Sequence, residues 1–184
     1  RRAHLIYLLG GFTRYLTDTL RGSLAWAAAE EAWQSGAVIA GSSAGALERG
    51  IAAAAPAQEE EEGEQGVTME PGMGFYREAL LDQHFLARGR IGRLLVAVLA
   101  TDSVPVGFGI DENTALVVDG SQARVLGASG MIIVDGRQAR RTSATRGTGL
   151  RVSLAGTGDA VDLTTLEVRA GAGKAPVPGT EGAL

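Results

Sequence analysis

Two adjacent serines, Ser42 and Ser43, stand between glycines in the stretch VIAGSSAGAL and could supply a nucleophilic hydroxyl. With Ser43 at the centre, the segment from Gly41 to Gly45 fits the pattern G-x-S-x-G. This pattern is typical of a sharp turn from a strand into a helix, where side chains two places from the serine would collide. The turn also leaves the amide of Ala44 available to an oxyanion. Small residues at such a turn serve packing equally well, so the motif needs a base and an acid beside it.

A histidine base can come from two positions, His4 and His84, because the chain holds two histidines. His4 begins an apolar run and would lie at the end of a parallel sheet opposite the ligand-binding edge. His84 follows an apolar run and would lie at the carboxyl end of its strand, where a base can act. The alternative for His84 is a ring satisfied by local hydrogen bonds on a polar loop. The chain has no cysteine, which excludes disulfides, thiolate metal sites and a cysteine nucleophile.

An orienting carboxylate could come from Asp111 or Glu112, which follow the apolar run 106–110. Two adjacent acids followed by Asn113 could also form a solvated turn. In an α/β-hydrolase lipase or esterase, the acid lies between the serine and the histidine along the chain. Here the one aspartate in that interval is Asp82, two residues from the histidine and poorly placed to act from another strand. The order of the residues therefore excludes the ordinary esterase arrangement.

The chain of 184 residues, 45% hydrophobic and 21% charged, predicts one globular domain over residues 1–170 and a disordered tail over 171–184. No apolar run is long enough to predict a membrane span. The net charge of −4 and the scattered basic residues argue against a nucleic-acid partner. The opening residues show no signal-like segment, and the sequence enters a strand at once. The N-terminus therefore does not indicate the compartment, because the sequence either begins inside a natural domain or lacks its preceding residues. We expect a cytoplasmic protein.

The elements that must position these side chains alternate in the first half of the chain, where apolar runs typical of buried strands follow segments of helical periodicity. Ser23 is the expected N-cap of a second helix, after a break at Gly22. This alternation predicts a parallel sheet covered by helices on both faces. The expected elements are a strand at 4–9, two helices between 13 and 34, a strand at 37–40, a helix from 44, a strand from 79 that ends at 82–84, a helix over 91–99 and a strand at 106–110.

Two segments depart from this alternation. Residues 54–72 combine a block of glutamates with Pro, Gly and Gln, which predicts a solvated, mobile loop; the alternative is an acidic rim that attracts cationic substrates. After Thr114 the chain is rich in β-formers separated by Asp-Gly and Gly-rich turns, which predicts a meander of strands added to the α/β core. The expected runs lie at 114–118, 123–127, 130–135, 150–155 and 165–169.

Three segments, GSSAGA, DQHFLARGRIGRL and GFGIDENTALVV, resemble the signatures of the cyanophycinase and dipeptidase E family of serine peptidases, closest to the cyanophycinase branch. The resemblance runs from about His4 to Glu167. It implies a three-layer α/β/α sandwich with a mainly parallel sheet, akin to the class I glutamine amidotransferase domain, with a β-rich C-terminal part. The family also has strands before the position of His4. We therefore expect one edge of the sheet to be covered by preceding residues or by a partner chain, as in a homodimer.

Carried onto this sequence, the resemblance implies Ser43 as the nucleophile, His84 as the general base and Glu112 as the acid, with Asp111 less favoured. It implies no cofactor and no metal. The expected partner is a peptide or isopeptide substrate with aspartyl carboxylates, of the β-aspartyl-arginine type. The residues that the resemblance assigns to the substrate cleft are Asp82, Gln83, Arg88, Arg90 and Arg93.

The resemblance further implies an oxyanion hole built from the backbone amides of Gly11 and Ala44. The arginines of the cleft suit a substrate with carboxylates, because guanidinium binds carboxylate in a bidentate fork; a solvated helix start is the alternative for each of them. The family follows its double glycine with an acidic or amide residue and then glutamine, whereas Phe12 and Thr13 follow Gly11 here. This departure favours either a shifted specificity or a catalytically silent binding or assembly module on the same fold.

Overall fold

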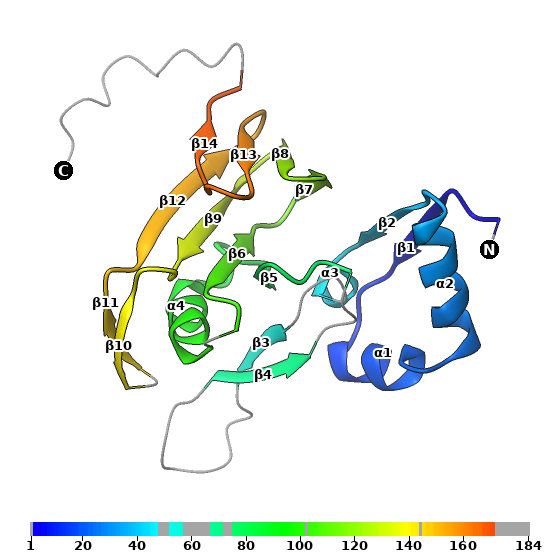
Figure 1. Ribbon diagram of the computed structural model, residues 1–184, viewed down its shortest axis with the longest axis horizontal. Helices are drawn as coiled ribbons and strands as arrows, with labels where there is room; N and C mark the ends of the chain where they lie inside the picture. The colour runs from blue at the N-terminus through cyan, green and yellow to red at the C-terminus, as the bar shows by residue number, and fades with distance from the viewer. Residues whose placement is uncertain are drawn as a thin grey trace.

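The computed structural model describes residues 2–47, 52–56, 67–71, 75–101, 103–143 and 145–171 of the chain. Figure 1 shows these residues as two neighbouring parts, with the N-terminal elements on the right and the strand-rich remainder on the left. The first elements are β1 (Leu5–Leu8), α1 (Thr13–Leu20), α2 (Leu24–Gln34), β2 (Val38–Gly41), α3 (Ala44–Leu47), β3 (Ala52–Pro56), β4 (Val67–Pro71), β5 (Leu80–Gln83), α4 (Ile91–Ala100) and β6 (Val106–Ile110). The later elements are β7 (Thr114–Asp119), β8 (Gln122–Gly127), β9 (Gly130–Asp135), β10 (Arg140–Ser143), β11 (Arg146–Thr148), β12 (Arg151–Gly156), β13 (Ala160–Asp162) and β14 (Val168–Arg169).

The N-terminal part is built from β1 and β2, which pair in parallel so that Leu8 lies opposite Gly41 at their carboxyl ends. Helices α1 and α2 form the crossover that a parallel pair requires. The hydroxyl of Ser23 accepts the amide hydrogen of Trp26 at 3.1 Å and caps α2. Gly22 precedes this cap with a φ of 73°, which a glycine adopts without strain. The predicted break between the two helices is therefore confirmed.

The main sheet has the strand order β12-β9-β6-β5-β3-β4 and is mixed. The pairs β5–β6 and β3–β5 are parallel, whereas β3–β4, β6–β9 and β9–β12 are antiparallel. The α/β character expected from the sequence is confirmed, but the expectation of a mainly parallel sheet is wrong. Beyond β6 no helix lies between the strands of the described residues, and without a crossover helix neighbouring strands join by turns and pair antiparallel.

The two faces of this sheet have different covers, because alternate residues of a strand point to opposite sides. Leu80 and Ile132 lie in a buried cluster to which α4 contributes Leu94. Their neighbours Leu81 and Ile133 belong to a second buried cluster, shared with the sheet β14-β13-β8-β7. This second cluster contains no residue of a helix. Within the described ranges, a sheet thus stands where the sequence led us to expect a second helical layer.

The strand-rich half of the chain differs from the expected meander in its arrangement. The five predicted runs correspond to β7, β8, β9, β12 and β14, while β10, β11 and β13 were missed. The short strands β10 and β11 carry exposed side chains throughout, so they lack the alternation of burial that sequence patterns report. β9 and β12 belong to the main sheet, and β7, β8, β13 and β14 form the second sheet. The core therefore extends into the segment that the sequence presented as an addition.

Part of the acidic segment expected as a loop over 54–72 forms strands instead. Residues 52–56 and 67–71 form β3 and β4, which pair with each other and connect to β5 through Ala53 and Leu81. Backbone hydrogen bonds form this strand pair, and the loop-like composition of residues 54–72 did not reveal it. The rest of the loop prediction, residues 57–66 and 72, and the tail prediction from residue 172 onward lie outside the described residues. In the part of the chain that the structure describes, no helix is both long and apolar enough to cross a membrane.

Candidate active site

Ser43 lies at the sharp turn between β2 and α3 and has a φ of 51°, which few residues with a side chain adopt. The glycines around it are required by close backbone contacts. A Cβ on Gly41 would come within 2.2 Å of the carbonyl oxygen of Gly45, and a Cβ on Gly45 within 2.2 Å of the carbonyl oxygen of Leu8. The turn therefore holds the serine backbone in an unusual conformation against the end of β1, as a nucleophile elbow does.

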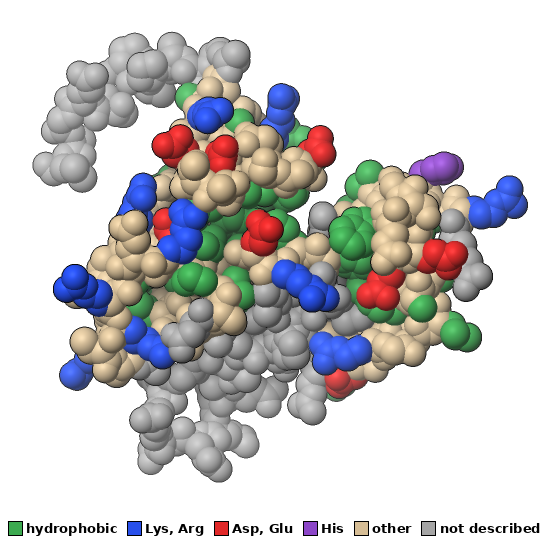
Figure 2. All heavy atoms as spheres, in the orientation of Figure 1, with side chains coloured by type: hydrophobic (Ala, Val, Ile, Leu, Met, Phe, Trp, Pro, Cys, Tyr) green, Lys and Arg blue, Asp and Glu red, His purple; other side chains and the backbone are tan. Residues whose placement is uncertain are grey.

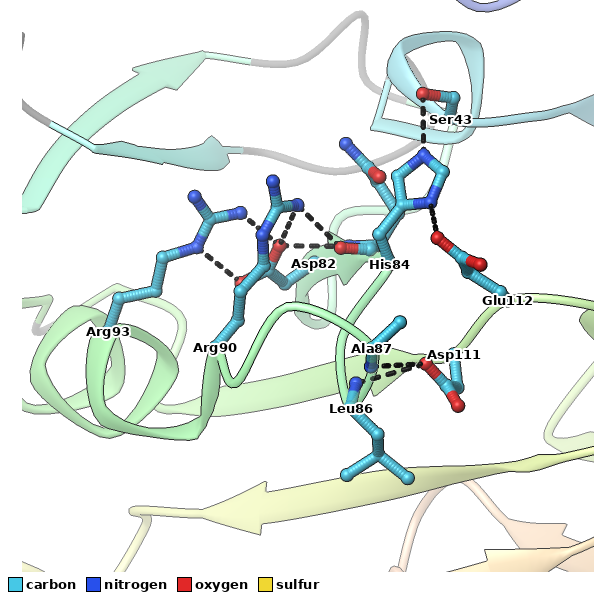
Figure 3. Close-up of polar contacts among 10 residues, drawn as sticks. Ser43, Asp82, His84, Leu86, Ala87, Arg90, Arg93, Asp111 and Glu112 are labelled. Carbon is cyan, nitrogen blue, oxygen red and sulfur yellow. Dashed lines mark hydrogen bonds and ion pairs between the residues drawn. The ribbon is translucent and has the colours of Figure 1, made fainter.

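His84 follows directly after β5 and also has a positive φ, of 50°. Its Nε2 lies 3.2 Å from the Oγ of Ser43 (Figure 3). The next residue, Phe85, is fully buried, and its amide donates to the carbonyl oxygen of Ile110 at 3.3 Å. The ring of Phe85 occupies the space over Gly109, where a Cβ would come within 2.4 Å of it. A buried anchor in the sheet thus fixes the backbone that carries the imidazole.

Glu112 is the acid that meets this imidazole: its Oε1 lies 2.7 Å from His84 Nδ1. A neutral ring that donates its Nδ1 hydrogen to the carboxylate keeps the lone pair of Nε2 toward the serine hydroxyl. The side chain of Glu112 is 47% exposed. Exposed ion pairs contribute little to stability, because water screens them. The contact therefore serves to orient the ring more than to hold the fold together.

Asp111, the other candidate acid, points elsewhere. Its Oδ1 accepts the amide hydrogens of Leu86 and Ala87, both at 3.0 Å, and its Oδ2 accepts the hydroxyl of Ser129 at 2.8 Å. Burial raises the pKa of Asp111, but the hydrogen bonds from the Ala87 amide and the Ser129 hydroxyl outweigh this effect and hold the pKa below its ordinary value. Asp111 is therefore a carboxylate that binds the loop after His84, and no pattern in the sequence indicated its partner Ser129.

The two amides proposed for an oxyanion hole come from segments beside the serine. Ala44 is buried and follows Ser43 directly. Gly10 lies against the side chain of Ser43, since a Cβ on Gly10 would lie 2.8 Å from the Cβ of Ser43 and 3.4 Å from its Oγ. Gly11 has a φ of 152°, and Phe12 after it is 75% exposed. Ala44 follows Ser43 in the chain, and Gly11 follows the glycine that lies against Ser43. The role of their amides in an oxyanion hole stays a prediction.

The residues expected at the substrate cleft form a charged cluster at the end of β5 and the start of α4. Asp82 has a fully buried side chain. Arg93 donates two hydrogen bonds to this carboxylate, and the one from Nε to Oδ2 measures 2.7 Å. Nη1 of Arg90 lies 3.4 Å from Oδ1 of the same carboxylate and donates to the carbonyl oxygen of Gln83 at 2.5 Å. Asp82 can therefore contribute to binding through the arginines that it holds. The substrate-binding roles of Gln83, Arg88, Arg90 and Arg93 stay predictions.

This cluster carries an excess of positive charge, because two guanidinium groups share one buried carboxylate. Burial lowers the pKa of Arg90, and repulsion from Arg93 adds to this effect. Next to the arginines, the Oε1 of Gln83 is buried and accepts no hydrogen bond among the described residues. Within the same residues, no three His, Cys, Asp or Glu side chains gather as metal ligands would. The cluster is thus suited to an anionic or hydrogen-bond-donating group of a ligand.

The segments of the site meet at the junction of the two parts of the molecule. Figure 2 shows the surface hollowed between these parts, with acidic and basic side chains along the lower rim of the hollow. In the same orientation, Figure 1 places α3 and β5 at this junction.

Comparison with known proteins gives a consistent result for most of the chain. Residues 1–126 match the model of peptidase family S51. A cyanophycinase of Synechococcus elongatus is 29% identical over 175 residues, which cover 89% of this chain and 54% of the relative. A cyanophycinase of Trichormus variabilis is 40% identical over 78 residues, which cover 42% of this chain and 26% of the relative.

One solved structure extends this similarity to the fold. The crystal structure of a peptidase from an acI-B1 Actinobacterium superposes with a TM-score of 0.64 at 27% sequence identity and covers 87% of this chain and 59% of that chain. The chain thus spans about half the length of the curated relatives that it matches over most of its own length.

Proposed function

Because the chain belongs to peptidase family S51, a family of serine peptidases, we propose that it is a cyanophycinase-like peptidase that hydrolyses a peptide or isopeptide bond at an aspartyl residue. The observation that carries this proposal is the pair of contacts from Ser43 to His84 and from His84 to Glu112, at 3.2 and 2.7 Å. A nucleophile within reach of a base that a third group orients is the geometric signature of covalent catalysis.

In the proposed reaction, Ser43 Oγ attacks the scissile carbonyl carbon while His84 Nε2 accepts the hydroxyl proton. Glu112 stabilises the imidazolium that forms, through its contact with Nδ1. Collapse of the tetrahedral intermediate breaks the C–N bond, and His84 passes its proton to the leaving amine. A water molecule then attacks the acyl-enzyme, gives its proton to His84 and releases the carboxylic acid, and Ser43 regains its hydrogen.

The negative charge that develops on the carbonyl oxygen needs donors fixed in advance. We assign this task to the backbone amides of Gly11 and Ala44, which lie on the two segments that flank Ser43. Backbone amides are suited to it because they cost no reorganisation when the charge appears, and one such donor typically contributes about 10²–10³ in kcat.

The charged cluster around Asp82 is the proposed recognition site for a carboxylate of the substrate. Arg90 and Arg93 together carry one positive charge more than the buried carboxylate cancels, and their planar groups bind carboxylates in a defined geometry. The curated relatives named above are cyanophycinases. Together with the arginines, this supports a substrate of the β-aspartyl-arginine type.

Replacing Ser43 with alanine tests the proposal, with Ser42→Ala as the matched control. Ser42 is the neighbouring serine, and its amide, rather than its hydroxyl, bonds to Leu8 at 3.1 Å. We expect Ser43→Ala to lower kcat for a β-aspartyl-arginine dipeptide by a factor on the order of 10⁶, and Ser42→Ala to retain most of the activity. Hydrolysis at the normal rate by Ser43→Ala would refute the assignment.

A catalytically silent binding module on the same fold is the competing function, and the exposed Phe12 after the double glycine is the observation that favours it. A fluorophosphonate probe separates the two functions, because it reacts with an activated serine hydroxyl. Labelling at Ser43 that His84→Ala abolishes supports the peptidase. A folded protein that the probe leaves unlabelled supports the binding module.

A further inference from the structure

The adjacent acids Asp111 and Glu112 face two different targets, which Figure 3 shows together. Glu112 meets the ring of His84, whereas Asp111 meets the backbone of Leu86 and Ala87, the second and third residues after that histidine. One carboxylate therefore holds the side chain of the base, and the other holds the loop on which the base is mounted.

This loop needs an anchor. The φ of 50° at His84 lies in the left-handed region, which costs about 1–2 kcal/mol for a residue with a side chain. On one side the buried ring of Phe85 fixes the loop to the sheet. On the other side Leu86 is 48% exposed and borders a hollow of about 430 Å³ that Ser129 also lines. Apolar packing therefore secures one side of the loop, and hydrogen bonds must secure the other.

Asp111 is itself held by the strand-rich part of the chain. Its amide donates to the carbonyl oxygen of Gly130 at 3.2 Å, and its Oδ2 accepts the hydroxyl hydrogen of Ser129 at 2.8 Å. Ser129 is fixed in turn, because the hydroxyl of Thr157 donates to its carbonyl oxygen at 3.0 Å and to that of Gly127 at 2.7 Å. The chain of contacts from Thr157 to the His84 loop therefore crosses three segments that are far apart in sequence.

We propose that Asp111 and Ser129 are positioning residues, which hold the loop after His84 so that the imidazole stays within reach of Ser43. The inference rests on the proposed peptidase function and assigns a task to Ser129, which lies beyond the residues that match the family model. Asp111 holds the loop through the geometry of its hydrogen bonds and not through its negative charge. An asparagine at position 111 can do the same, since its carbonyl oxygen accepts from both amides and its NH₂ group donates to the serine oxygen.

Four variants test this assignment: Asp111→Ala, Asp111→Asn, Ser129→Ala and, as the control, Asp119→Ala. Asp119 is an exposed acid at the far end of β7 and lies outside the proposed site. A misplacement of about 1 Å costs roughly 10² in rate, so we expect Asp111→Ala to lower kcat about 100-fold with KM unchanged. We expect Asp111→Asn to stay within about threefold of the parent chain, and Ser129→Ala to lose about fivefold, as the loss of one hydrogen bond allows.

Two further measurements separate positioning from a loss of folding. The folded fraction of each variant, from circular dichroism and denaturant unfolding, should not account for the fall in kcat. The imidazole NMR signals provide a readout without turnover, because the chain holds just His4 and His84. The signals of His84 should shift or broaden in Asp111→Ala and stay close to those of the parent chain in Asp111→Asn, while His4 is unchanged in both.

The outcomes are distinct. Asp111→Asn as inactive as Asp111→Ala would show that charge matters and overturn the inference, as would a fall in kcat that matches the unfolded fraction. If Asp111→Ala does not fold, normal kcat and normal His84 signals in Ser129→Ala overturn it as well. If the parent chain hydrolyses no substrate and its Ser43 reacts with no probe, the proposed function fails, whereas the His84 signals still report whether Asp111 holds the loop.

Discussion

Replacing Gly45 with alanine should dismantle the turn that presents Ser43. The added Cβ would lie 2.2 Å from the carbonyl oxygen of Leu8 and 2.8 Å from that of Leu9. Both are backbone atoms at the end of β1, so no side-chain rotation relieves the contact. Ordinary contact between heavy atoms begins near ~3.5 Å. The end of β1 and the serine turn must therefore separate by about 1 Å.

The cost of this separation has two parts. Overpacking of a well-packed site costs about 1–3 kcal/mol. The carbonyl oxygen of Leu8 also accepts the amide hydrogen of Ser42 at 3.1 Å, and the loss of that hydrogen bond costs about 1 kcal/mol more. Together they give a loss of about 2–4 kcal/mol, which in a domain of this size lowers Tm by about 5–15 °C. If the protein is a peptidase, a shift of about 1 Å at Ser43 should also lower kcat roughly 100-fold.

Thermal unfolding followed by circular dichroism measures the first effect, and hydrolysis or fluorophosphonate labelling measures the second. Gly92→Ala is the matched control, because a Cβ there meets no heavy atom within 4 Å and alanine favours the helix by up to about 1 kcal/mol. Gly45→Ala with the Tm and the labelling rate of the parent chain would refute the steric reasoning, and with it the view that Leu8 closes the turn.

Two further perturbations test the charged cluster and the core. Asp82→Asn should destabilise the protein by about 3–5 kcal/mol, because Arg93 then loses its buried counter-charge; an unchanged denaturant midpoint would contradict this. Burial, and then the charge of Glu78, raises the pKa of Tyr76 to about 12. Since the folded protein favours the protonated phenol, this contribution to stability is complete below a pH of about 10 and is lost as the pH rises toward 12. Tyr76→Phe should remove this loss of stability at alkaline pH, together with the last step of phenol ionisation in an ultraviolet titration. If the variant still loses stability at alkaline pH, another group causes the loss.

Local features of the sequence predicted the elements of the first half well. Ser23 caps the helix that the sequence assigned to it, and the apolar run before Asp82 is a buried strand. Such features depend on neighbours a few residues away, so they can be predicted from a single sequence. The order of the strands in the sheet could not be predicted in this way. β9 and β12 join the main sheet through backbone hydrogen bonds, which almost any buried strand can make whatever its side chains.

The sequence by itself determined which side chains are candidates for the nucleophile, the base and the acid. Glycines on either side of Ser43 indicated a strained turn, and the scarcity of histidine left His84 as the one base at the expected edge of the sheet. The residue types also restricted the acid to a pair of neighbours, Asp111 and Glu112.

The family resemblance favoured Glu112 over Asp111 as the acid, but only the tertiary structure shows that Glu112 contacts the imidazole and that Asp111 binds the backbone of Leu86 and Ala87 instead. Successive residues at the end of a strand point in opposite directions, and the phase of that alternation depends on where the strand ends and how the following turn bends. Here Glu112 faces His84 while Asp111 faces Ser129, and Asn113, with a φ of 53°, follows the two acids. These contacts join residues 18 to 41 positions apart, and no local pattern in the sequence encodes them.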